Sequence, residues 1–218
     1  MSGWLQRGLL FWLLCLPLAV CAEGPVVYSV DPTRSELVVQ LFKTGVGAAL
    51  AHDHVVRATE YTGSIQGDTT DPTTAVIIIE VRAASLQADE PEIRHRYGLT
   101  APLSEEDRRA VQATMLSASQ LDVQRFPTIR FRSTKVVPQG TGRYAVTGEL
   151  TIRGVTQPVS FPVQVELHDR VLRGRGTVRF LQSSFGYKPY SAFLGAVRNK
   201  DEVLLHFDIV APLAGTRR

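Results

Sequence analysis

The feature that most constrains the fold is a period-two alternation of apolar and polar residues between Phe126 and Val165. The alternation comes in three runs, separated by residues typical of turns at 138–142 and 153–158. A pattern of this kind predicts β-strands with one apolar face and one face toward water. Three consecutive runs predict antiparallel hairpins, which are typical of a barrel or a sandwich with an apolar interior.

Shorter runs with strand character flank this region. They predict further strands at 26–31, 36–42, 53–67, 75–82, 171–180 and 202–211. About eight strands are enough to close a small barrel, and closure removes the exposed edges of a sheet. We therefore expect an all-β fold, an antiparallel barrel of about eight strands, with a sandwich as the alternative.

One segment, about residues 86–122, breaks the strand pattern. Ser104 and the three acidic residues after it are typical of a helix start, because the hydroxyl caps the helix and acids favour its first turn. The helix would have a modest apolar face made by Ala110, Val111, Thr114 and Met115. We expect this helical insertion to be a lid or plug for one end of the barrel, or a cover for an open edge.

Residues 1–22 have the pattern of a secretory signal peptide. Arg7 is the only charged residue before Glu23, an apolar run covers 9–20, and small residues precede the expected cleavage site. The apolar run is too short for a membrane-spanning helix. We therefore expect a mature chain of one domain, residues 23–218, in the periplasm or secreted.

Both cysteines, Cys15 and Cys21, lie in the predicted signal segment. The predicted mature chain therefore has no thiol or disulfide, and its core must stabilise it alone. The alternative is that Cys21 is a lipidated first residue, since residues 18–21 loosely resemble a lipoprotein motif. Val20 is large for the position before such a cysteine.

The charge pattern argues against nucleic-acid binding. Without Arg7 the chain has 23 basic and 21 acidic residues. It has no run of five basic residues, and its aromatic residues are not interleaved with Lys or Arg. An electrostatic footprint for nucleic acid is therefore missing.

Two histidines stand out because they are two positions apart. On a strand, His52 and His54 would point to the same side, which is the spacing of a metal-binding pair. The distant His95 is the one attractive third ligand, and the predicted mature chain offers no cysteine. We expect no metal and keep His52 and His54 as weak candidates. A contact to the head group of a ligand or a structural role is the other interpretation.

Signals for catalysis are weak. The chain has no Gly-x-Ser-x-Gly motif and no cysteine in its predicted mature part. Asp89, Glu90 and Glu92, with Pro91 among them, are interpreted as a solvated loop and not as a pair for acid–base work. We therefore do not expect an enzyme.

Four segments in chain order carry a resemblance to a known family. They are residues 28–32 with Ser35, residues 126–134, residues 148–156, and Phe185 with Gly186. Together they resemble the YceI-like family of secreted lipid-binding proteins over nearly the whole predicted mature chain. The LTIRGVT block after FPTIRF is the most specific part. The resemblance implies an extended lipocalin-like antiparallel barrel whose apolar tunnel holds a polyisoprenoid chain, such as a quinone or a polyprenyl compound.

The chain departs from the family pattern at two places. Residues 51–55 (AHDHV) stand where the family has a Gly-x-Phe strand opening, and the helical insertion precedes FPTIRF. Both departures lie where the mouth of the barrel is expected.

Strand alternation also predicts which side chains point inward. The expected lining residues are Ile129, Phe131, Tyr144, Val146, Leu150, Phe161, Val163, Val178, Phe180, Leu205 and Phe207. Such a barrel can be filled by side chains or keep a tunnel, and only the resemblance favours the tunnel. At the mouth, or at the head group of a ligand, we expect His52, His54, Tyr187, Tyr190 and Phe193.

The inward apolar faces predict an apolar core, and the resemblance implies a binding protein that holds an isoprenoid lipid or quinone by burial, for storage or transport, with no cofactor apart from the bound lipid. A transient contact with a membrane and a homodimer stay open. The alternatives are a metal-dependent enzyme or redox accessory protein built on His52 and His54, and a scaffold with a filled core.

Overall fold

The computed structural model describes residues 25–68 and 70–215. The predicted signal peptide, residues 1–22, lies outside the described residues together with Cys15 and Cys21. Of the helices in the described ranges, none has the length and apolar character needed to cross a membrane.

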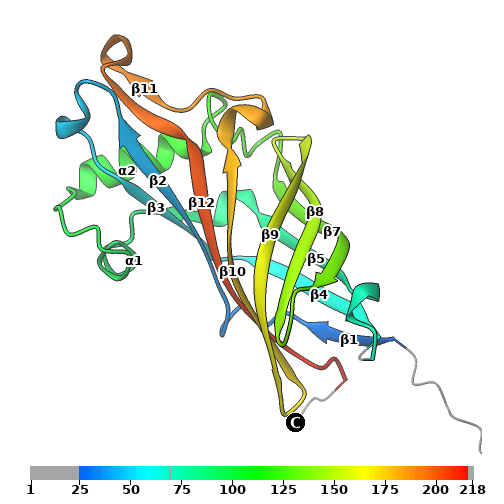
Figure 1. Cartoon of the computed structure of the whole chain (residues 1–218). Helices are drawn as coiled ribbons and strands as arrows, with labels where there is room; N and C mark the ends of the chain where they lie inside the picture. Colours follow the sequence, from blue (N-terminus) through cyan, green and yellow to red (C-terminus); the bar gives the residue numbers. More distant parts are fainter. Residues whose placement is uncertain (1–24, 69, 216–218) are drawn as a thin grey trace, which may run out of the picture.

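The described residues form one antiparallel sheet of twelve strands, which is curled into a half-barrel (Figure 1). The strands are β1 (Val26–Ser29), β2 (Glu36–Thr44), β3 (His54–Ala58), β4 (Tyr61–Gly67), β5 (Val76–Arg82), β6 (Leu86–Ala88), β7 (Thr128–Pro138), β8 (Arg143–Ile152), β9 (Val155–His168), β10 (Val171–Leu181), β11 (Ser191–Ala192) and β12 (Val197–Pro212). Their order is β1-β4-β5-β7-β8-β9-β10-β12-β2-β3-β6, and β11 pairs with β12. The expected all-β antiparallel fold is confirmed, and the sandwich alternative is wrong.

The expected number of about eight strands is also wrong. The single strand expected at 53–67 is two strands, β3 and β4, because the chain turns at Thr59 and Glu60. The short strands β6 and β11 are three and two residues long, which is too short for alternation to reveal.

The three alternating runs form β7, β8 and β9 as a continuous meander. Phe131 pairs with Leu150 across β7 and β8, and Val146 pairs with Phe161 across β8 and β9. Residues directly opposite each other in an antiparallel pair share one face of the sheet. The register therefore places the apolar faces of all three strands on the inner side.

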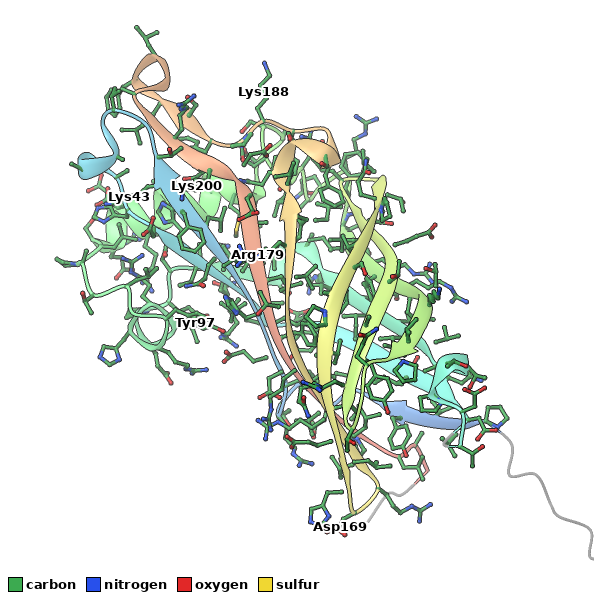
Figure 2. All side chains as sticks on the ribbon, viewed as in Figure 1. Lys43, Tyr97, Asp169, Arg179, Lys188 and Lys200 are labelled. Carbon is green, nitrogen blue, oxygen red and sulfur yellow. The ribbon has the colours of Figure 1, made fainter. Side chains whose placement is uncertain are left out.

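The half-barrel has two different ends, which we name the mouth end and the far end. At the mouth end lie the β2–β3 connection, the loop after β10 and the β11–β12 turn, whereas the far end carries the β9–β10 hairpin (Figure 1). Figure 2 shows Lys188 at the mouth end and Asp169 at the far end. Near the far end, β1 also contacts the chain just after β12, since the Ala214 amide donates to the Val27 carbonyl at 2.6 Å.

The helical insertion contains α1 (Pro91–Arg96) and α2 (Glu105–Leu116). The expected helix start is confirmed, because the Ser104 hydroxyl accepts a hydrogen bond from the Asp107 amide at 3.0 Å. Five short 3-10 helices complete the described elements: Ala48–Leu50, Pro72–Thr74, Ala83–Ser85, Gln182–Phe185 and Phe193–Gly195. The first residues of the expected insertion are not helical but form β6.

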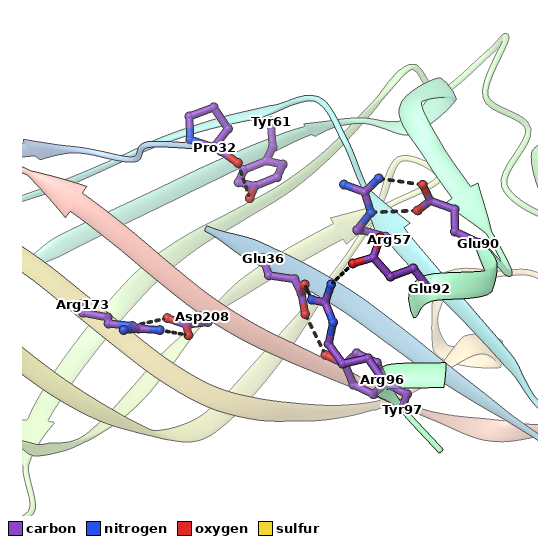
Figure 3. A network of polar contacts seen from close by, with 10 residues as sticks. All are labelled: Pro32, Glu36, Arg57, Tyr61, Glu90, Glu92, Arg96, Tyr97, Arg173 and Asp208. Carbon is purple, nitrogen blue, oxygen red and sulfur yellow. Dashed lines mark hydrogen bonds and ion pairs between the residues drawn. The ribbon is translucent and has the colours of Figure 1, made fainter. Parts of the chain in front are cut away.

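The two helices lie on opposite faces of the sheet edge. The α1 residue Ile93 packs on Val38 and Val55, on the outer face of β2 and β3. Polar contacts fasten α1 there: Arg57 holds Glu90 with two hydrogen bonds, and Glu36 contacts Arg96 (Figure 3).

Helix α2 packs on the inner side and covers the edge strand β6. The Gln112 side chain accepts from the Ala88 amide and donates to the Leu86 carbonyl, both at 2.7 Å. These two bonds satisfy backbone groups that an edge strand would otherwise leave unpaired. Val111 and Met115 pack against the inner core.

Candidate ligand-binding cavity

A cavity of about 850 Å³ lies between the curled sheet and α2. This volume is in the upper part of the range of about 300–1,000 Å³ that small-molecule sites occupy. The lining is mostly apolar and comes from strands all around the sheet. It extends from His52 and Tyr190 at the mouth end to Asp68 and Leu167 near the far end, so the cavity runs along the barrel.

All the residues expected to point inward from the strands line this one cavity. They are Ile129, Phe131, Tyr144, Val146, Leu150, Phe161, Val163, Val178, Phe180, Leu205 and Phe207. Strand alternation therefore placed their side chains correctly. That they contact a bound ligand stays a prediction.

Three phenylalanine rings form a row across the cavity wall. The ring centres of Phe131 and Phe161 are 5.5 Å apart, and those of Phe161 and Phe207 are 5.6 Å apart. Two glycines make room for the outer rings of this row. A Cβ on Gly148 would come 2.5 Å from the Phe131 ring, and one on Gly176 would come 2.6 Å from the Phe207 ring. Glycine within a strand often marks such a close approach.

Helix α2 supplies the part of the wall that the strands leave open. Its four predicted apolar-face residues, Ala110, Val111, Thr114 and Met115, all line the cavity. Strand alternation does not indicate them as site residues, and their helical spacing is the sequence signal that points to them. A helix whose apolar face is narrow and whose other faces are charged must bury that face somewhere, and here the cavity receives it.

Behind the cavity wall, His54 is held by a buried ionic cluster. Asp89 is 1% exposed. One carboxylate oxygen of Asp89 lies 2.6 Å from Nδ1 of His54. The other accepts from Arg94 at 2.8 Å and from the Val55 amide at 3.2 Å. Arg94 also donates to the Asp53 carbonyl at 2.9 Å, so the cluster ties α1 to the start of β3.

The environment of Asp89 keeps its carboxyl group ionised. Burial alone would raise the pKa of Asp89, but the hydrogen bond and charge of His54 and the hydrogen bonds from Arg94 and Val55 hold it below its usual range. The interpretation of Asp89, Glu90 and Glu92 as a solvated loop is therefore wrong for Asp89. It is also wrong for Glu90, which pairs with Arg57 at 2.7 Å.

The cluster engages only one ring nitrogen of His54, Nδ1. His54 lines the cavity, and among the described residues its Nε2 has no hydrogen-bond partner. Because Asp89 engages Nδ1, Nε2 accepts a hydrogen bond when the ring is neutral and donates one when the ring is protonated. Either form can hold a polar group of a ligand, such as a hydroxyl or a carbonyl.

The structure brings most of the other expected mouth residues to the same end of the cavity. His52, Tyr187 and Tyr190 line it together with His54. Burial raises the pKa of Tyr187 to about 12, although the Arg153 guanidinium lies 5.8 Å from its ring centre. Its phenol therefore stays protonated and able to donate. Phe193 does not line the cavity, because it is 82% exposed at the β11–β12 turn.

The histidines do not assemble into a metal site in the described part of the chain. His95 is exposed on α1, which lies on the outer face of the sheet. No group of three His, Cys, Asp or Glu residues within 25–68 and 70–215 has the arrangement of a metal site. Nδ1 of His54 is already engaged by Asp89.

Comparisons with known proteins identify the family and agree with the fold. The YceI-like domain pattern matches residues 28–211. A UPF0312 protein of Pseudomonas putida is 27% identical over 154 residues, 69% of each chain. A UPF0312 protein of Pseudomonas fluorescens is 31% identical over 151 residues, 68% of each chain.

Two solved structures share the architecture. BcnA of Burkholderia cenocepacia is similar with a TM-score of 0.63 and 19% identity, over 84% of this chain and 99% of its own. The YCEI protein of Campylobacter jejuni gives a TM-score of 0.55 and 12% identity, over 72% of this chain and 82% of its own. At these identities the two structures support the fold alone. Fold and family pattern together describe a barrel-type binding protein.

Proposed function

The chain belongs to the YceI-like family, and on this premise we propose that it carries a long isoprenoid lipid, of the quinone or polyprenyl type, in its cavity. The protein works in the periplasm or outside the cell and releases the lipid unchanged. It acts by burial and not by catalysis.

The continuous apolar cavity carries this proposal. It runs along the barrel, and its wall is formed by aliphatic and phenyl side chains from the strands and α2. An extended isoprenoid tail in such a cavity gains about 25 cal/mol for each Å² of apolar surface removed from water. A compact polar substrate would instead leave most of the apolar wall without a partner.

The polar groups at the mouth end suit the head group of such a lipid. His54 lines the cavity, its Nε2 is not engaged by Asp89, and its ring orientation is fixed by that buried carboxylate. Tyr187 and Tyr190 line the same end and carry phenol groups. A quinone carbonyl or a polyprenyl hydroxyl can therefore form hydrogen bonds there while the tail extends toward the far end.

The proposal predicts that filling the cavity abolishes lipid binding. Leu205 lines the cavity, so Leu205→Trp should lower the affinity for a ubiquinone with a long isoprenoid tail by at least about tenfold. The measurement is the amount of quinone that co-elutes with the protein in gel filtration, read from the absorbance of the quinone ring.

The matched control is Leu181→Trp, because Leu181 is 45% exposed and lies outside the cavity lining. It should bind the quinone as the wild type does. Circular dichroism of both variants checks that they are folded. The wild type is also tested with a quinone that has no isoprenoid tail. If it bound this quinone as well as the long-tailed one, or if the two variants bound the long-tailed quinone equally, burial of the tail would not be the source of affinity.

A further inference from the structure

The mouth end carries an apolar tip that projects from the molecule. The three most exposed large apolar side chains among the described residues are Val46, Phe193 and Leu194, with Val46 at 99% and Phe193 at 82%. Val46 lies in the β2–β3 connection, whereas Phe193 and Leu194 lie in the β11–β12 turn. We call these three residues the apolar tip.

The two connections that carry the apolar tip are held side by side. The Gly47 amide donates to the Ala196 carbonyl at 2.8 Å. A Cβ on Gly45 would come 2.4 Å from the same carbonyl oxygen, so the two backbones touch. The apolar tip is therefore one surface and not two unrelated loops.

The backbone of the β11–β12 turn is unusual for its residues. Phe193 and Leu194 have φ angles of 51° and 53°, in the left-handed region that bulky side chains rarely occupy. Strained conformations of this kind concentrate at functional sites. Here the conformation holds two large apolar side chains out in water.

Several positively charged side chains lie at the same end of the molecule as the apolar tip. Lys43, Lys188 and Lys200 lie at the mouth end, so three of the four lysines of the chain are there (Figure 2). Arg198 joins them, since it pairs with Thr44 beside the β2–β3 connection. None of these four side chains forms an ion pair with another described residue.

Two acidic residues near these basic side chains have other partners. The Asp201 carboxylate accepts from both the amide and the hydroxyl of Ser183, and Glu202 pairs with Arg179 at 3.1 Å. The far end, by contrast, carries charges of both signs near its loops: Asp68, Asp71, Glu166 and Asp169 together with Arg143 and Arg170. The three lysines and Arg198 at the mouth end thus distinguish it from the far end.

We propose that the apolar tip docks the mouth of the cavity on the surface of an anionic lipid bilayer. The side chains of the tip enter the interfacial layer, and the lysines and Arg198 face the anionic head groups. Tyr190, Val197 and Asn199, which border the β11–β12 turn, line the cavity, so docking sets the opening against the membrane. This inference rests on the proposed function, because docking is how an apolar cargo would pass between membrane and cavity without crossing water.

A bilayer suits the apolar tip better than a protein partner does. A stable protein interface takes about 20–30 residues from each side. The apolar tip has three large side chains on two narrow connections, which is a small apex and not a face. Insertion into a bilayer interface needs only such an apex with nearby positive charge.

The test is co-sedimentation of the purified protein with vesicles of phosphatidylcholine alone or mixed with phosphatidylglycerol. The wild type should bind the mixed vesicles, more weakly as salt is raised. The tip variant, which combines Phe193→Ser with Leu194→Ser, should bind about tenfold more weakly than the wild type, because two apolar side chains no longer leave water. Lys188→Glu combined with Lys200→Glu should weaken binding to the mixed vesicles by a similar factor.

Leu181→Ser is the matched control for vesicle binding, since Leu181 is 45% exposed and lies outside both the apolar tip and the cavity lining. It should bind mixed vesicles as the wild type does. Equal binding by the wild type and the tip variant would overturn the docking proposal, and so would a dimer in analytical ultracentrifugation that the tip variant loses.

A separate measurement keeps the two proposals apart. In solution, without vesicles, the tip variant should still take up the long-tailed ubiquinone, because its cavity is intact. If neither protein takes up quinone while the wild type still binds vesicles through the tip, the proposed function fails and the docking surface stands.

Discussion

At the scale of single residues, the most informative feature is the pairing of His54 with Asp89. A carboxylate that is 1% exposed is costly unless its charge is paired and hydrogen-bonded. Arg94, His54 and the Val55 amide supply those partners. The cluster fixes the ring of His54, joins α1 to β3 and leaves Nε2 of His54 unengaged.

We predict that Asp89→Asn destabilises the protein and removes part of its sensitivity to acid. Losing one member of a buried pair leaves Arg94 uncompensated, at a cost of about 3–5 kcal/mol in the free energy of unfolding. In the wild type, the lowered pKa of Asp89 means that its contribution is complete above about pH 4 and is lost as the pH falls through the lower folded value. Urea denaturation between pH 7 and pH 3 measures both effects.

Glu92→Gln serves as the comparison, because the Glu92 side chain is 87% exposed. Its unfolding free energy should stay within about 0.5 kcal/mol of the wild type. An Asp89→Asn variant that loses stability toward acid as steeply as the wild type does would show that Asp89 is not one of the groups responsible.

The orientation of a side chain can be predicted from the sequence where strand alternation applies, but not where a tertiary contact decides whether the residue is buried. Leu205 and Phe161 were placed on the inner face because every second residue of a strand shares a face. For Asp89 the local sequence, which is acidic and contains a proline, predicts a solvated loop. Its burial depends on α1 folding back over β3, which no local pattern in the sequence reports.

At the scale of elements, the cavity depends on how strands and α2 share its wall. The start of α2 could be predicted because Ser104 and the acids after it act locally. Its position could not, because the Gln112 bonds to β6 join residues far apart in the sequence. Strands as short as β6 and β11 also carry too few residues for a pattern.

The row of phenyl rings leads to a prediction on strand β10. Gly176→Ala should lower the free energy of unfolding by about 1–3 kcal/mol, because the new methyl group would meet the Phe207 ring and the Pro162 carbonyl at 2.6 Å. Gly174→Ala in the same strand is the control, since its methyl group would meet Val163 at an ordinary 3.6 Å. Thermal unfolding of both variants gives the comparison, and equal melting temperatures would contradict this account of the rings.

At the scale of the whole molecule, the question is why the half-barrel holds a cavity and not a filled core. Alternation gives the inward residues, but it does not give the distance between opposite walls. That distance depends on the curl of the sheet and on α2 lying against its edge, which are properties of the complete fold. The family resemblance favoured a tunnel, and the structure has a cavity of about 850 Å³.

The two ends of the molecule carry different groups. The mouth end combines the polar groups of the cavity with the apolar tip and three lysines, while the far end carries the β9–β10 hairpin, which has charges of both signs. A carrier needs a cavity, a means of holding the head group and a side that faces the membrane. The described residues offer a candidate for each.

Native mass spectrometry of the protein purified from its own host tests the central claim most directly. We predict an apolar compound of isoprenoid mass bound to the wild type, released by organic solvent and strongly reduced in Leu205→Trp. Protein that carries no lipid, together with stoichiometric zinc or copper that is lost on His52→Ala, would contradict the carrier function.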